Sequence, residues 1–216
     1  FDGNYDFNIS GTLIAQGTVS DSIIFRKSGD MNPQNTWKGF TLYNASDETI
    51  FEYVRISGGD KNYAGGAMYL DNSDPIIRNV TMDYNEGGMR LISSNPSMTN
   101  VTITNNYGNG EGGGMNLDNS DPTMINVTIS NNTAIHAAGM GIYNQSSPIM
   151  NNVAIVNNSA VALGGAIYAF SANINLINCT IAGNIAGTTN GIVNDGGSSI
   201  NIQNSILWGD SPLSTT

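Results

Sequence analysis

The chain has 216 residues, and its 7 Lys and Arg residues against 17 Asp and Glu residues give a formal net charge of −10. Nucleic acids and anionic membranes are both bound through clusters of Lys and Arg, so we expect neither as a partner. No apolar run approaches the roughly 20 residues of a membrane span, so we expect no membrane insertion by this segment. Only 11% of the residues are charged.

The first part of the chain is the least regular, and we expect residues 1–36 to form an irregular first coil or cap. Short apolar runs such as Ile23-Ile24-Phe25 stand between single glycines such as Gly17 and Gly29, a pattern of short strands and turns. No linker divides the sequence, so 1–216 is predicted to be a single domain with regular coils over 37–213. We expect it to be part of a longer protein.

An internal repeat dominates the remainder of the chain. The segment Ile77-Arg78-Asn79-Val80-Thr81-Met82 recurs with its Asn at positions 100, 126, 152, 178 and 204. The first spacing is 100 − 79 = 21, and the later ones are 126 − 100 = 152 − 126 = 178 − 152 = 204 − 178 = 26. A repeat of this length indicates a solenoid in which each unit forms one coil.

The residues around the repeated Asn predict how each coil faces the core. The positions two before, one after and three after the Asn are almost all apolar, whereas the position two after it is Thr in most coils. Such alternation indicates strands with an apolar inner face and an outward Thr. The Asn would turn the chain at a left-handed corner, and stacked Asn side chains would bond from coil to coil.

A glycine-led strand, such as Gly66–Leu70, supplies a third strand upstream of the corner in each coil. We therefore predict an all-β chain folded as a right-handed parallel β-helix, a solenoid of about eight coils with three short strands per coil. A second Asn column follows the first at a distance of six positions: Asn85, Asn106, Asn132, Asn158 and Asn184.

The segments Gly65-Gly66-Ala67-Met68-Tyr69 and Gly164-Gly165-Ala166-Ile167-Tyr168, together with the Asn corner, resemble a known repeat. They are similar to the right-handed parallel β-helix proteins of bacterial surfaces, including the polymorphic outer-membrane protein type with its Gly-Gly-Ala-Ile signature. The resemblance covers 37–213. It implies an extracellular or bacterial cell-surface location, with a polysaccharide or a host or cell surface as partner. Adhesins, lyases, hydrolases and epimerases all use this scaffold, so the resemblance leaves the activity open.

The outward face of the glycine-led strands is the predicted binding surface. Its slots hold Tyr69, Arg90, Asn116, Ile142, Tyr168 and Asn194. In lyase-like proteins of this fold the same face forms the saccharide groove. Aromatic rings stack on sugars, while Asn and Arg bond hydroxyl groups, so we predict ligand binding by Tyr69, Arg90, Asn116 and Tyr168. The alternative is a solvated sheet face with scattered tyrosines.

Two Asp-rich corners are candidate calcium sites. The segments Asp71-Asn72-Ser73-Asp74-Pro75 and Asp118-Asn119-Ser120-Asp121-Pro122 each offer two carboxylates. Calcium takes carboxylate and carbonyl oxygens, so Asp71, Asp74, Asp118 and Asp121 are the predicted ligands. The alternative is an Asx-type turn before proline, with no metal. We expect no bound cofactor unless calcium occupies these corners.

Three functions remain after these considerations. We expect a non-enzymatic, secreted or cell-surface segment that acts as a rigid, adhesin-like scaffold and binds glycans. The alternative is a calcium-dependent polysaccharide lyase or another carbohydrate-active enzyme, with Arg90 as the candidate catalytic base. The remote alternative is an ice-binding solenoid that uses the outward Thr column, which Ala154 and Ile206 interrupt.

Overall fold

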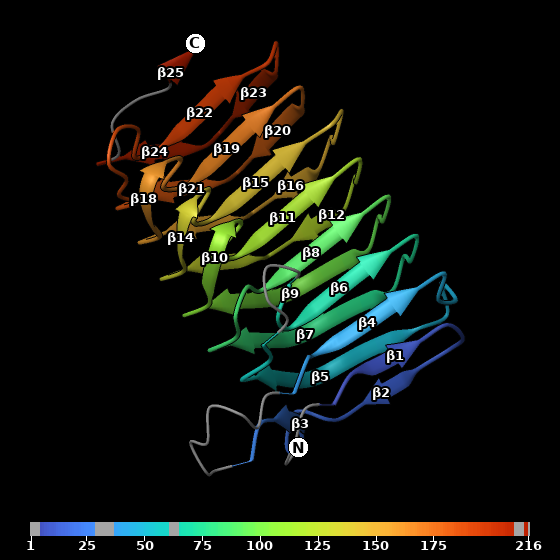
Figure 1. Ribbon diagram of the computed structural model, residues 1–216. Helices are drawn as coiled ribbons and strands as arrows, with labels where there is room; N and C mark the ends of the chain where they lie inside the picture. The colour runs from blue at the N-terminus through green and yellow to red at the C-terminus, as the bar shows by residue number, and fades with distance from the viewer. Residues whose placement is uncertain (1–4, 29–36, 61–64, 210–213, 216) are drawn as a thin grey trace.

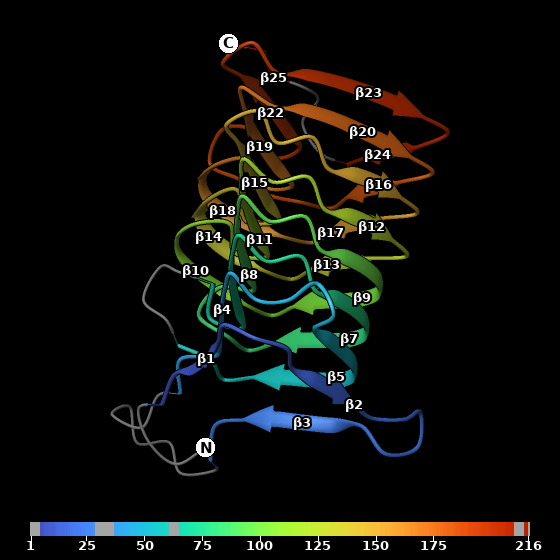
Figure 2. The same ribbon diagram turned by 90° about the vertical axis from the view of Figure 1, so that its right-hand side faces the viewer.

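The computed structural model describes residues 5–28, 37–60, 65–209 and 214–215, and all of its regular structure is β (Figure 1). The strands stack coil upon coil into a rod, with the two chain ends at opposite ends of it (Figure 2). Every strand pairing in the described residues is parallel, as the register Met68↔Met89↔Met115 illustrates. None of these residues belongs to a helix that could cross a membrane.

The glycine-led strands build a nine-stranded sheet. Residues such as Met68 and Leu70 point into the core and are fully buried, while Tyr69 and Asp71, which alternate with them, face outward. This is the period-2 alternation of a half-buried strand. In order along the rod, the strands are β1 (Phe7–Ile9), β4 (Phe40–Tyr43), β6 (Met68–Asp71), β8 (Met89–Ile92), β11 (Met115–Asp118), β15 (Met140–Tyr143), β19 (Ile167–Phe170), β22 (Ile192–Asp195) and β25 (Ser214–Thr215).

The strands on both sides of the repeated Asn lie in a single 13-stranded sheet. In β7 and β9 they form one eight-residue strand bent at the corner, where Asn79 and Asn100 both have φ 55°. The predicted left-handed corner is thus confirmed. The strands are β2 (Ile14–Gln16), β3 (Ile23–Arg26), β5 (Ile50–Ser57), β7 (Ile76–Asp83), β9 (Ser97–Thr104), β12 (Thr123–Ile125), β13 (Thr128–Ser130), β16 (Ile149–Asn151), β17 (Ala154–Val156), β20 (Asn173–Ile177), β21 (Thr180–Ala182), β23 (Ser199–Gln203) and β24 (Ile206–Trp208).

A third, smaller sheet stands beside the glycine-led face in three successive coils. It consists of β10 (Tyr107–Glu111), β14 (Thr133–His136) and β18 (Ser159–Leu163), which we call the wall. The 21-residue coil lacks a wall strand: 89 − 85 − 1 = 3 residues separate Asn85 from Met89, against 115 − 106 − 1 = 8 between Asn106 and Met115. The wall therefore ends at β10, and we call the gap that the five missing residues leave beside it the notch.

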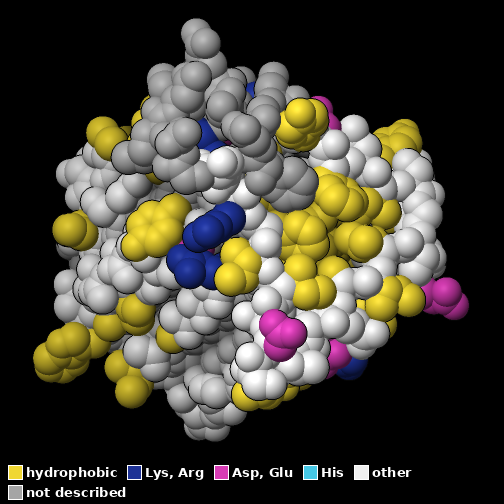
Figure 3. Space-filling view, turned by 90° about the horizontal axis from the view of Figure 1, so that it is seen from below, with side chains coloured by type: hydrophobic (Ala, Val, Ile, Leu, Met, Phe, Trp, Pro, Cys, Tyr) yellow, Lys and Arg dark blue, Asp and Glu magenta, His cyan; other side chains and the backbone are white. Residues whose placement is uncertain are grey.

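The predicted all-β parallel solenoid is confirmed, with about six regular turns rather than eight. The segments at the two ends of the rod, with β1 to β3 at one end and β25 at the other, depart from the regular repeat. Of the predicted regions, 1–4, 29–36, 61–64, 210–213 and 216 lie outside the described residues. Figure 3 looks onto the first coil from below and shows hydrophobic side chains gathered there.

The core is a stack of like residues along the rod. Val80, Val101, Val127, Val153 and Cys179 follow one another, and none is more than 2% exposed. Burial of each such side chain contributes about 1.5–3 kcal/mol. Cys179 therefore serves as one more small apolar residue, and burial raises the pKa of its thiol.

The second Asn column, not the corner column, forms the buried ladder of the rod. Asn132 is fully buried and shows the pattern. Its Oδ1 accepts bonds from the backbone N–H and the Nδ2 of Asn106, both at 3.0 Å. Its Nδ2 donates to the carbonyl of Ile103 and to Oδ1 of Asn158, again at 3.0 Å. All four bonding positions of the amide are thus satisfied.

The corner Asn residues also bond to one another, but at the surface. Asn126 Nδ2 donates to Asn100 Oδ1 at 3.1 Å, and both side chains are exposed. A third column consists of buried serines at the Asp-rich corners. The backbone N–H of Ser94 donates to Ser120 Oγ at 3.0 Å, and Ser120 Oγ donates to the carbonyl of Asp118 at 2.9 Å.

Replacing Asn132 by Leu should lower the free energy of unfolding by about 3 kcal/mol or more, because it leaves the buried N–H of Asn106 unpaired. The matched control is Asn126→Gly, which removes an exposed rung at a position with φ 56° that glycine adopts readily. We expect the control to cost less than about 1 kcal/mol, because exposed side-chain bonds add little. Urea unfolding measures both values, and equal losses would contradict the assignment of the load to the buried ladder.

Candidate functional site

The structure brings three of the predicted binding residues together on neighbouring strands. Tyr69 on β6 pairs with Arg90 on β8, which pairs with Asn116 on β11. Asn116 is followed in the same row by Gly141 and then by Tyr168 on β19. Tyr168 therefore lies two coils from Asn116.

Two other expected positions in this row were wrong. Ile142 is fully buried, because the outward slot of β15 belongs to Gly141. Asn194 pairs with the buried Ala169, whereas Val193 is the partner of Tyr168. The unusual segment around Gly139 and Gly141 obscured which residues of β15 face outward.

Gly141 makes room for an aromatic side chain that the sequence did not single out. A Cβ on Gly141 would lie 2.6 Å from Cε2 of Tyr143, so the Tyr143 ring lies across the glycine. The ring centroids of Tyr143 and Tyr168 are 5.9 Å apart. Together the two rings form an aromatic floor on the outward face of the sheet.

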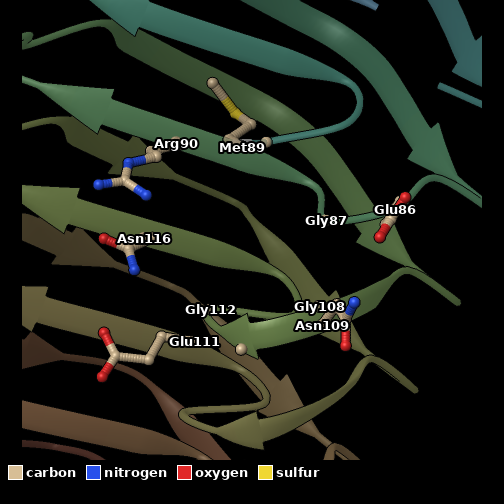
Figure 4. A pocket seen from close by; sticks show the side chains of 11 residues that line it. Glu86, Gly87, Met89, Arg90, Gly108, Asn109, Glu111, Gly112 and Asn116 are labelled. Carbon is tan, nitrogen blue, oxygen red and sulfur yellow. The ribbon is translucent and has the colours of Figure 1, made fainter. Parts of the chain in front are cut away.

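An open groove lies next to this floor. It has a volume of ≈ 390 Å³ and is lined by Arg90, Glu111, Asn116, Asp118, Tyr143 and Asn144. We call this set the groove. Glu111, at the end of wall strand β10, forms one side of it, and Figure 4 shows Arg90, Asn116 and Glu111 on the same side of the adjoining pocket. A smaller hollow of ≈ 150 Å³ continues from Glu111 to His136, Leu163 and Tyr168.

The tyrosines of this face are neutral hydrogen-bond donors. Burial, followed by the negative charge of Glu111, raises the pKa of Tyr143 far above its usual value. Burial and Asp71 raise the pKa of Tyr69, while the Arg90 charge opposes them. Burial raises the pKa of Tyr168, as does its bond to Asp195, in which Oη donates to Oδ2 at 3.1 Å. All three phenols are therefore neutral, and the Tyr168 hydroxyl already donates its one hydrogen to Asp195.

A small niche marks the notch in the wall (Figure 4). Its volume is ≈ 20 Å³, about the room that one water molecule needs. Arg90, Glu111 and Asn116 line both the niche and the groove, and Glu86 lies at its other end. The glycines Gly65, Gly87, Gly108, Gly110 and Gly112 supply much of the remaining lining.

Glu86 belongs to a pair of carboxyl groups at the far side of the notch. It forms a parallel bridge with Asp60 of the previous coil. The hydrogen bond with Asp60, then burial and the Asp60 charge, raise the pKa of Glu86 to about 7, against a smaller opposing effect of Lys38. Below that pH Glu86 is protonated and can donate a hydrogen bond to Asp60.

Three of the four carboxylates predicted to bind calcium have structural partners. The backbone N–H of Asn95 donates to Asp74 Oδ1, and that of Ser147 donates to Asp121 Oδ1, both at 2.5 Å. Asp118 Oδ1 accepts a 2.6 Å bond from the amide of Asn144. Within the described ranges, no three His, Cys, Asp or Glu residues are grouped to hold a metal ion. Calcium binding by Asp71, Asp74, Asp118 and Asp121 stays a prediction.

Sequence reasoning missed Glu111, Tyr143 and Asn144 as groove residues. Tyr143 had a usable signal, because it pairs with Asp118 once β15 is aligned through Gly141. Glu111 had none of this kind: it follows the Gly108-Asn109-Gly110 segment, whose path is set by the wall and not by the repeat.

Comparison with known families agrees with this architecture. A family model described as "Right handed beta helix region" matches residues 38–207. The chain belongs to this right-handed β-helix family. The expected right-handed winding is thereby confirmed. No curated protein and no solved structure matches the chain, so the β-helix family defines the fold and leaves the activity open.

The Asp60–Glu86 pair should make the stability of this β-helix depend on pH. The pKa of Glu86 is raised from 4.5 to about 7 in the folded chain. The stability that protonated Glu86 contributes is therefore complete below about pH 4.5 and is lost as the pH rises through about 7. Glu86→Gln removes this titration. Its stability relative to the parent chain should therefore improve between about pH 5 and about pH 8 in urea unfolding.

The control for this measurement is Glu48→Gln, which replaces an exposed acid away from the pair. The difference in the free energy of unfolding between Glu86→Gln and the parent could instead stay constant across the pH range. That result would show that the pKa of Glu86 is not raised by its contact with Asp60.

Proposed function

We propose that this β-helix is a non-catalytic, adhesin-like scaffold that binds an uncharged glycan chain in the groove. The observation that carries the proposal is the aromatic floor: Gly141 lets the Tyr143 ring lie across the sheet beside Tyr168. The proposal places the segment outside the cell or on a bacterial surface. Support for that location comes from the resemblance of its glycine-led repeats to those of bacterial surface proteins.

The groove has the chemical groups that sugar binding requires. Aromatic rings offer their faces to the apolar side of a pyranose. Arg90 and Asn116 donate hydrogen bonds to ring hydroxyls, while Glu111 and Asp118 accept them. An open groove along successive coils suits a chain more than a single small molecule.

The charges of the groove favour an uncharged glycan over an acidic one. Its lining holds one cation, Arg90, against the two acids Glu111 and Asp118, and the whole chain carries a net charge of −10. A polyuronate would bring further carboxylates to this surface and be repelled. The calcium-dependent lyase therefore ranks second, since that enzyme would need bound cations to neutralise both the acidic groove and its acidic polysaccharide.

Binding should be measured by calorimetry with hexasaccharides of β-1,4-linked glucose, xylose and mannose, and with an oligogalacturonate for comparison. We expect at least one uncharged hexasaccharide to bind. Arg90→Ala and Asn116→Ala should each weaken that binding about tenfold, because each removes a hydrogen bond worth about 1.4 kcal/mol. Asn151→Ala, an exposed Asn on the other sheet, is the matched control and should bind as the parent does.

Two results would contradict the proposal. In the first, none of the uncharged hexasaccharides binds, or binding is the same in the Arg90 and Asn116 variants. In the second, oligogalacturonate gives unsaturated products that absorb in the ultraviolet, and both a chelator and Arg90→Ala abolish them. That outcome would establish the lyase.

A further inference from the structure

A second hollow lies on the other side of the notch, away from the groove. Its volume is ≈ 490 Å³, and none of its lining residues lines the groove. It opens near the corner where the 13-stranded sheet turns toward the wall. The residues that line it are Lys27, Gly58, Gly59, Asp60, Tyr84, Asn85, Glu86, Asn105 and Tyr107.

Tyr84 has a left-handed backbone conformation, and the aligned positions of the other coils that share it hold glycine or Asn. It immediately precedes the ladder residue Asn85, at a position that has positive φ in seven successive coils of the described residues. The other members are Gly58, Asn105, Asn131, Asn157, Gly183 and Gly209. Glycine and Asn adopt this region readily, whereas Tyr, with φ 55°, is strained there. Backbone strain of this kind concentrates at functional sites.

The flanking residues hold Tyr84 in this conformation. Asp83 is clamped by Arg55, whose Nε and Nη2 donate to the two carboxylate oxygens at 3.1 Å and 2.6 Å. Asn85 accepts the N–H of Gly59 at 2.9 Å and donates to Asn106 at 2.9 Å. The backbone is thus fixed on both sides while the Tyr84 side chain remains 64% exposed. A ring presented in this way loses little conformational freedom on binding.

A second exposed tyrosine completes an aromatic pair around the ladder. Tyr107 directly follows Asn106, lines the same hollow and is 54% exposed. Glu86 and Asp60 line the same hollow, where protonated Glu86 can donate a hydrogen bond and the carboxyl oxygens can accept one. Lys27 offsets the remaining negative charge, so the lining is close to neutral.

From this arrangement we infer that the hollow is a second ligand site, and that it takes an uncharged sugar ring. The ring stacks on Tyr84 or Tyr107, and its hydroxyls bond to the acid pair, Lys27 and the Asn105 amide. The site does not depend on the proposed function, because no residue of the groove takes part. A glycan chain can therefore be bound at the hollow even when the groove is empty.

The test uses the same uncharged hexasaccharides and follows backbone amide signals in ¹H–¹⁵N spectra of the parent chain. Signals of Gly58, Gly59 and Asn105 report on the hollow, and those of Asn116 and Asn144 report on the groove. We expect the hollow signals to shift on titration with at least one hexasaccharide. Arg90→Ala should leave these shifts unchanged, which separates this site from the groove.

Two variants test the tyrosines. Tyr84→Gly installs the residue found at Gly58 and Gly183, so we expect an unchanged or higher melting temperature but at least about fivefold weaker binding at the hollow. Tyr107→Ala should weaken binding to a similar degree. The matched control is Tyr53→Asn, which also replaces a left-handed Tyr, with φ 50°, by the Asn of its column and lies outside the hollow.

The inference fails if the hollow signals do not move with any of the hexasaccharides at roughly 10 mM. It fails equally if both Tyr84→Gly and Tyr107→Ala bind as tightly as Tyr53→Asn, or if only the oligogalacturonate shifts these signals. If the hollow signals shift and the groove signals do not, the result counts against the proposed function and supports the site in the hollow.

Discussion

A buried amide can exist in this rod only when the coils above and below it supply its partners. Each Asn of the ladder bonds to the ladder Asn residues of the neighbouring coils and to a backbone carbonyl, as Asn132 and Asn158 show. Water is excluded, so an amide displaced by one residue would lose all of these bonds at once. The ladder therefore sets the register of the five coils from Asn85 to Asn184. The two large sheets inherit their alignment from it.

The candidate sites lie where the chain departs from this regular pattern. The five-residue deletion opens the wall beside Arg90, Gly141 vacates a slot for the Tyr143 ring, and Tyr84 replaces glycine or Asn at a left-handed position. Each departure leaves the ladder intact. The candidate sites and the architecture thus occupy different positions of the same repeat, and for that reason the most regular residues are of least use in assigning an activity.

The sequence predicted the periodic part of the structure well. The apolar columns, the outward Thr and the left-handed corner Asn follow from local rules of strand alternation and backbone sterics, and Asn79 and Asn100 obey them. The same rules placed Tyr69, Arg90 and Asn116 in one row. They could not rank the two Asn columns, because burial of a side chain depends on how the whole coil closes.

The irregular part escaped prediction for a physical reason. The wall forms only where the loops of three successive coils pair with one another, so its strands have no counterpart in the other coils from which to infer them. Glu111 reaches the groove through this pairing, opposite His136. Tyr143 depends on the space above Gly141, a contact within one strand that a column alignment does not contain.

The short coil has a wider consequence. Between Asn85 and Met89 the chain simply omits the residues that form β10 in the next coil, and both large sheets continue past the omission in register. Insertions and deletions at this edge therefore alter the surface that holds the groove, while the contacts between coils along the rod stay as they are. Loop length alone can reshape this surface, with no compensating change in the interior.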